Sequence, residues 1–182
     1  MGTSVLWLPT SYYLLAAGMY FTCHFLDLFD GQIARKLNQT SQFGAVLDYT
    51  SDVVCHTSML MALASVVPSQ LLPLAIVMMV EVVGCVVSMY LTASGNYWKN
   101  TDAGTPFLLK KVIVNQAYTT FGKVMLMVYQ AFFSLSWVLA NHPSITTSHP
   151  IFLLWAALLP GAFVNFLIHY SIAYEGIRKW KE

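Results

Sequence analysis

Five long apolar runs constrain the fold of this chain more than any other feature of its sequence. A helix needs about 20 residues to cross the hydrocarbon core of a bilayer, and each run approaches that length. Inside lipid the backbone must satisfy its own hydrogen bonds, and the alternating pattern of a membrane barrel is absent. The sequence therefore predicts an all-α integral membrane bundle of five spanning helices, at residues 12–29, 46–67, 71–91, 117–140 and 151–173.

The composition agrees with a membrane location. Hydrophobic residues make up 57% of the 182 residues and charged residues only 9%, whereas a soluble domain carries about a quarter charged residues. A net charge of +1 without a basic stripe gives no case for nucleic-acid binding. Because the sequence has no repeat, no low-complexity tract and no long linker, we expect one domain over residues 1–182.

Lysine and arginine residues predict the orientation of the bundle. Eight of the nine follow the first, third and fifth apolar runs, and Lys123 alone lies inside a run, whereas the loops at 66–70 and 140–150 contain none. Cytoplasmic loops of membrane proteins are enriched in lysine and arginine. The sequence therefore places residues 27–52 at the cytosolic face of the membrane.

Half of the eight acidic residues fall within residues 27–52. Asp27 and Asp30 lie at the end of the first apolar run, and Asp48 and Asp52 at the start of the second. Spacings of three and four residues place each pair on one face of its helix. A short connection predicts that the two helices are antiparallel neighbours, so the four carboxylates converge. Their mutual repulsion in a partly desolvated site requires a cation.

The residue types favour hard metal ions and a phosphate. Four carboxylates without histidine or cysteine are typical of Mg²⁺ or Mn²⁺ sites, and all four together are enough to hold two ions. Gly31 allows a ligand to approach the backbone closely. Arg35 offers a planar guanidinium for phosphate oxygens, and Ser41 adds a hydroxyl. These three residues are candidate binding residues for a phosphate-bearing cofactor or substrate. The alternative is a solvated acidic cluster that merely ends two helices.

These residues resemble the signature of the CDP-alcohol phosphatidyltransferase family at every fixed position. The signature runs Asp-x-x-Asp-Gly-x-x-Ala-Arg from Asp27 to Arg35, and continues after eight residues with Gly44, Asp48 and Asp52. The resemblance implies a membrane enzyme that transfers a phosphatidyl group from a CDP-linked lipid to an alcohol and releases CMP. It also implies that Asp52, besides ligating metal, is the catalytic proton acceptor.

The stretch LNQTSQFGAVLD, residues 37–48, is most similar to the phosphatidylinositol synthase branch of that family. This resemblance implies CDP-diacylglycerol and inositol as substrates. Tyr49 and Val53 stand where the glycerophosphate branch usually has proline and lysine, which weighs against that branch. Glycerophosphate, serine or another acceptor is the alternative, as are a catalytically silent relative and a carrier of divalent cations.

The family is built on six spans, and the resemblance implies that the first is missing here, so that a homodimer partner is a candidate cover for the nucleotide site. Two further ionisable residues in apolar runs have open roles. Glu81 is either part of the site or a hydrogen-bonded structural residue. Lys123 either meets an anionic headgroup or extends to the interface. We expect His24, His56 and His169 to be hydrogen-bonded helix residues rather than ligands.

Overall fold

The computed structural model describes residues 12–94, 99–114, 117–142 and 144–180. Five long helices form the bundle and confirm the all-α prediction. They are α2 (Tyr13–Lys36), α3 (Gln42–Val66), α4 (Leu71–Ala93), α6 (Thr120–Asn141) and α7 (Pro150–Trp180). The connections add a 3₁₀ turn η2 (Pro68–Gln70), the short helix α5 (Phe107–Val112) and a two-stranded hairpin of β1 (Ile113–Val114) and β2 (Ala117–Tyr118). The sequence did not predict this hairpin.

The protein is an all-α membrane protein. The segments Pro68–Ala93, Thr120–Asn141 and Pro150–Trp180 are long and apolar enough to cross a bilayer by their length and composition alone. The helices α2 and α3 have sufficient length, with 24 and 25 residues. Their polar residues, including four aspartates, lower their hydropathy. The two helices that carry the four aspartates are therefore the least apolar members of the bundle, and three of the five predicted spans meet the criteria of length and composition within the described residues.

Local sequence explains how α2 ends and α3 begins. The helix α2 continues beyond residue 29 to Lys36, so its two aspartates lie within the helix rather than at its end. The following turn contains Asn38 with a φ of 54°, a left-handed conformation that asparagine tolerates. Ser41 then caps α3, because its hydroxyl oxygen accepts a hydrogen bond from the Gly44 backbone N–H at 2.9 Å.

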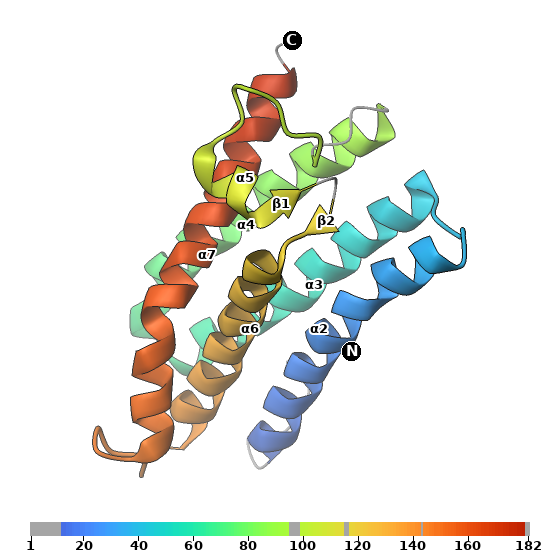
Figure 1. Cartoon of the computed structure of the whole chain (residues 1–182). Helices are drawn as coiled ribbons and strands as arrows, with labels where there is room; N and C mark the ends of the chain where they lie inside the picture. The colour runs from blue at the N-terminus through green and yellow to red at the C-terminus, as the bar shows by residue number, and fades with distance from the viewer. Residues whose placement is uncertain (1–11, 95–98, 115–116, 143, 181–182) are drawn as a thin grey trace.

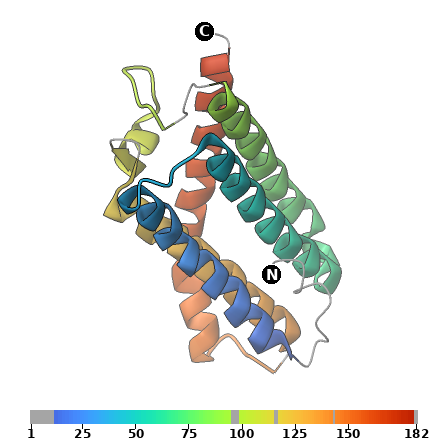
Figure 2. The ribbon, with the colours of Figure 1, turned by 90° about the vertical axis from the view of Figure 1, so that its right-hand side faces the viewer.

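The five long helices pack in an open ring, with α2 and α3 at its two ends. The helix α2 packs against α6, α6 against α7, α7 against α4, and α4 against α3. Figures 1 and 2 show α2 and α3 running antiparallel and joined by a short turn, as the sequence predicts. However, α2 packs mainly on α6 rather than along α3. The two halves of the acidic segment therefore belong to differently supported helices.

Two apolar clusters hold the bundle together at different levels. The first joins α2, α3 and α6 around Tyr20, Met59 and Phe133. The second joins α4, α5, the hairpin and α7, and includes Leu91 and Ile168. The segment with α5 and the hairpin lies at the same end of the molecule as the α2–α3 turn, which we call the loop end (Figure 1). A cavity lined by both polar and apolar residues lies between the helices.

Candidate functional site

The cavity has a volume of about 1000 Å³ and is lined by all five long helices. On α3 its lining includes Asp48, Asp52 and His56, which follow one another at four-residue intervals down one face of the helix. On α4, which runs the other way, Thr92 lies towards the loop end and Glu81 lies deep in the bundle. The cavity therefore extends from the loop end into the membrane-spanning part of the protein.

All four aspartates singled out by the sequence line this cavity. We call Asp27, Asp30, Asp48 and Asp52 the acidic cluster. The Asp27 carboxyl lies near those of Asp30 and Asp48, and Asp52 lies close enough to interact electrostatically with the other three. Asp27 and Asp52 are half-buried, whereas Asp30 and Asp48 are exposed to the open part of the cavity. The two predicted pairs therefore line one cavity from two helices.

The donor set of the acidic cluster fits a hard divalent cation, because it consists of carboxylate oxygens alone. Within the described part of the chain, no three His, Cys, Asp or Glu side chains stand close enough together to ligate one ion as they are placed. The Asp30 and Asp48 side chains are exposed, so neither is packed in a core. The residues thus fit a metal in type and line one cavity, but in this placement they do not form a ligand set.

The candidate phosphate-binding residues lie at the loop end of the same cavity. Gly31 and Ser41 both line it, and the Ser41 hydroxyl keeps its own proton available for donation while its oxygen caps α3. Arg35 belongs to the last turn of α2, but its side chain lies outside the described part of the structure. Gly31 and Ser41 therefore line the same cavity as the acidic cluster.

Two lysines bring positive charge to the cavity. The Lys99 ammonium lies 4.6 Å from the centroid of the Tyr118 ring, a cation–π arrangement. It also interacts electrostatically with Asp27 and Asp52. Lys123 lines the cavity from the first turn of α6. An anionic substrate group would therefore meet cations at the loop end, beside the acidic cluster.

The deep end of the cavity contains a hydrogen-bonded group that sequence reasoning did not assemble. Glu81 of α4 is 6% exposed and receives two hydrogen bonds. One comes from His56 Nδ1 on α3 at 2.5 Å, and the other from the Tyr129 hydroxyl on α6 at 2.5 Å. His24 of α2 and His169 of α7 also line this region. We call these five residues the cavity floor.

The open question about Glu81 thus has a structural answer. Its carboxylate ties three helices together, and it also lines the same cavity as the acidic cluster. Two signals in the sequence point to the floor: the ionisable Glu81 inside an apolar run, and the spacing of Asp52 and His56 at i and i+4. The contributions of α4, α6 and α7 depend on how far each helix is rotated about its axis, which the nearly uniform apolar pattern of a membrane helix does not reveal.

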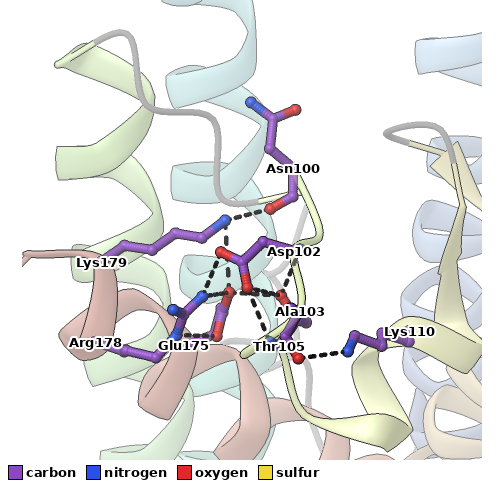
Figure 3. Close-up of polar contacts among 8 residues, drawn as sticks. All are labelled: Asn100, Asp102, Ala103, Thr105, Lys110, Glu175, Arg178 and Lys179. Atoms are coloured by element: carbon purple, nitrogen blue, oxygen red, sulfur yellow. Dashed lines mark hydrogen bonds and ion pairs between the residues drawn. The ribbon is translucent and has the colours of Figure 1, made fainter. Parts of the chain in front are cut away.

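A cluster of ion pairs fixes the segment that carries Lys99 (Figure 3). Arg178 of α7 donates to Asp102 at 2.6 Å, and to both carboxylate oxygens of Glu175 at 2.7 and 3.0 Å. The Thr105 hydroxyl donates to the fully buried Glu175 at 2.8 Å. We call Asp102, Thr105, Glu175 and Arg178 the loop clamp. It attaches the connection between α4 and α6 to the end of α7.

Further contacts support the loop clamp. The Asp102 and Thr105 side chains each accept from the other's backbone N–H, at 3.0 and 2.9 Å. Lys179 donates to the Asn100 carbonyl, next to Lys99. Gly104 leaves room for the guanidinium, since a Cβ there would lie 2.8 Å from an Arg178 nitrogen. The loop clamp therefore positions the chain around Lys99.

Protonation of Asp102 should open the loop clamp. The hydrogen bond from Arg178 lowers the pKa of Asp102 from 3.8 to about 2. Because the folded-state pKa is depressed, the stabilisation is present above the ordinary pKa and is lost as the pH falls through about 2. Removing the charge by Asp102→Asn should reproduce this loss at neutral pH, so we expect amide hydrogen exchange in residues 99–106 to quicken severalfold.

Hydrogen exchange measured by mass spectrometry checks this prediction. Lys36→Gln is the control, since it removes an exposed charge from the other connection at the loop end and should leave exchange in residues 99–106 unchanged. Equal exchange in wild-type protein and Asp102→Asn would contradict the role of the loop clamp.

Comparison with known proteins agrees with the signature. Curated relatives named CDP-diacylglycerol–inositol 3-phosphatidyltransferase include a Candida albicans protein that is 29% identical over 136 residues, covering 71% of this chain and 58% of the relative. A Drosophila melanogaster protein is 39% identical over 62 residues, covering 34% and 28% of the two chains. A Homo sapiens protein is 39% identical over 69 residues, covering 38% and 32%.

The matched region spans less than two thirds of the length of each of these relatives. No solved structure matches the chain. A family model described as CDP-alcohol phosphatidyltransferase matches residues 1–163, which include the acidic cluster, Lys99, Lys123 and the cavity floor except His169. With most of its length matched, and with the acidic signature gathered in one cavity, the chain belongs to the CDP-alcohol phosphatidyltransferase family.

Proposed function

We propose that this protein transfers the phosphatidyl group of CDP-diacylglycerol to myo-inositol, giving phosphatidylinositol and CMP. The observation that carries the proposal is the meeting of all four signature aspartates in one cavity of a membrane bundle. The names of the relatives support inositol as the acceptor. We propose that residues 1–182 form one catalytic domain.

The acidic cluster is the proposed site for two Mg²⁺ or Mn²⁺ ions, held by Asp27, Asp30, Asp48 and Asp52. Bound divalent ions supply neutralisation of the diphosphate and of the charge that develops on CMP. The family generally depends on such metals, and the oxygen-only donor set supports this assignment. Asp27 on α2 and Asp52 on α3 are both half-buried. A metal ion bound between the two helices would need a carboxylate from each of them.

Asp52 is the proposed proton acceptor. The acceptor oxygen attacks the phosphorus of the phosphatidyl group, and the bond from that phosphorus to the CMP phosphate oxygen breaks. Asp52 takes the proton that the acceptor hydroxyl loses, and CMP leaves with the bonding electrons. The position of Asp52, deeper in the cavity than Asp48 by one helical turn, lets it face an acceptor on the inner side of the phosphates.

Charged and polar groups at the loop end are proposed to bind the diphosphate. Gly31 offers close approach to the backbone of α2, Ser41 offers its hydroxyl proton, and Arg35 offers a guanidinium. Lys99 adds a charge held between Tyr118 and the acidic cluster. We propose that this end faces the cytosol, as the distribution of lysine and arginine predicts, in the membrane of the endoplasmic reticulum.

An acceptor panel tests the proposal. Purified protein in lipid vesicles is given CDP-diacylglycerol, Mn²⁺ and, separately, myo-inositol, glycerol 3-phosphate or serine. We expect CMP release and formation of a new lipid with myo-inositol, at a rate well above those with the other two alcohols. Preferred turnover of glycerol 3-phosphate or serine would refute the inositol assignment. Flux of Mn²⁺ into vesicles without CMP release would indicate a carrier. Absence of both activities would indicate a catalytically silent relative.

A further inference from the structure

The cavity floor, His24, His56, Glu81, Tyr129 and His169, has no assigned role in the reaction. It lies on the inner side of the acidic cluster. On α3, His56 follows Asp52 by four residues, or about 6 Å along the helix axis. A ligand bound at the floor would therefore lie one helical turn from the proposed proton acceptor.

The hydrogen bonds of the three histidines determine where their protons are. His24 Nδ1 lies 3.0 Å from the Tyr20 backbone oxygen, and His169 Nδ1 lies 3.0 Å from the Asn165 backbone oxygen. A carbonyl oxygen only accepts hydrogen bonds, so each Nδ1 must carry the proton. In the neutral ring Nε2 is then an acceptor. His56 follows the same pattern, since its Nδ1 faces the Glu81 carboxylate.

The Nε2 atoms of these rings are available for a ligand. His56 is 5% exposed, and its Nε2 is buried without a hydrogen-bond partner among the described residues. Such atoms are unfavourable in folded proteins unless a ligand or water satisfies them. In the described ranges of the chain, no hydrogen bond involves Nε2 of His24 or of His169 either, and both residues line the cavity.

The floor also has a definite electrostatic character. It contains the Glu81 carboxylate, and among the described lining residues the lysines lie away from it. Lys123 precedes Tyr129 on α6 by six residues, which is roughly 9 Å along the axis. Lys99 lies at the loop end beside Tyr118. A site made of hydrogen-bond acceptors and one carboxylate disfavours an anionic ligand and favours one that brings several hydroxyl protons.

We propose that the cavity floor is the acceptor subsite and recognises a neutral polyol. Hydroxyl groups of the ligand donate to Nε2 of His24 and His169 and approach His56, while one hydroxyl is left facing Asp52. This proposal rests on the proposed function, and it explains a preference for inositol over glycerol 3-phosphate by the absence of cations among the floor residues. It assigns the specificity for the acceptor to residues outside the signature.

Substitution of His169 tests the subsite. In His169→Asn the side-chain amide replaces Nδ1, so the bond to the Asn165 carbonyl is kept while the Nε2 acceptor is lost. We expect the KM for myo-inositol to rise about tenfold, as for one lost hydrogen bond. CMP affinity should stay the same, because the nucleotide binds at the loop end. In His169→Gln the amide reaches the Nε2 position, so the KM should be partly restored.

The double variant His24→Asn/His169→Asn should show a rise of about 100-fold if the two contributions add. His149→Asn is the matched control, since this exposed histidine lies in the connection between α6 and α7; its KM should be unchanged. CMP binding reports whether each variant is folded. An unchanged inositol KM in both His169→Asn and the double variant would overturn the subsite. A parallel loss of CMP affinity in folded protein would assign the floor to the nucleotide and also overturn it.

Equilibrium binding of radiolabelled myo-inositol separates this inference from the proposed function. The measurement uses the full chain with CMP and Mn²⁺ and requires no turnover. If wild-type protein binds myo-inositol and the double variant does not, the subsite stands even if no phosphatidylinositol forms. If wild-type protein turns over myo-inositol and binding is the same in the double variant, the proposed function stands and the subsite is wrong. No binding of myo-inositol to wild-type protein overturns the subsite.

Discussion

Asp52→Asn should lower turnover of CDP-diacylglycerol with myo-inositol by about 10²–10⁴-fold, the range typical for removal of a general base. Asparagine has nearly the same size as aspartate, so the packing of α3 should persist. It does not accept a proton from the acceptor hydroxyl, however, and the transfer step loses its proton acceptor. We therefore expect most of the CMP affinity to remain, and added Mn²⁺ to restore little of the activity.

Turnover and CMP binding, both measured across a Mn²⁺ titration, check this prediction. The split between rate and affinity is the informative quantity, because a loss confined to the rate indicates an interaction made in the transition state. If CMP affinity falls in parallel with turnover, and both recover at high Mn²⁺, Asp52 is a ligand alone and its assignment as proton acceptor is wrong.

Asp30→Asn should instead reduce CMP affinity and turnover together. Asp30 is exposed to the cavity and is one turn from Asp27 on the same helix, so this proposed ligand can be replaced without disturbing the packing. Substituting a residue that hydrogen-bonds to a metal ligand lowers metal affinity about 10–100-fold. Loss of a ligand itself should weaken metal binding by at least as much. Weaker binding is offset by concentration, so excess Mn²⁺ should recover a substantial part of both properties.

The same titration, performed on Asp30→Asn and on Asp52→Asn, provides the control for each variant. Both replace aspartate by asparagine within one cavity, so a general effect of lost negative charge would appear equally in the two. Asp30→Asn that binds CMP like wild-type protein, or that fails to respond to Mn²⁺, would contradict its assignment as a ligand.

The placement of the four aspartates around one cavity could be predicted from the sequence because the information for it is local. Asp27 and Asp30 share a helix face by spacing alone, and so do Asp48 and Asp52. The short connection through Ser41 makes α2 and α3 antiparallel without any knowledge of the remaining helices. The prediction was less accurate at helix ends. Polar residues such as Gln32 continue α2 beyond its apolar run, and a search for apolar runs ends too early there.

The cavity floor and the loop clamp were beyond a reading of the sequence, for different reasons. The floor joins Glu81 to His56 and Tyr129 from two other helices, and its assembly depends on helix rotation. Lipid-facing and buried positions of a membrane helix are similarly apolar, so the sequence contains little record of that rotation. The loop clamp pairs Asp102 with Arg178 across 76 positions in the chain. The local sequence around either residue does not indicate which residue it pairs with.

The loop clamp has a consequence for how this protein acquires its orientation. Arg178 and Lys179 count towards the basic flank that marks one end of the last helix, yet in the folded protein they contact Glu175 and the loop at Asp102 and Asn100. Orientation is decided as helices enter the membrane, before contacts between distant segments form. In the proposed orientation the same two cations have two successive roles. They first favour the cytosolic side for the end of α7 during insertion, and they later hold the loop beside Lys99.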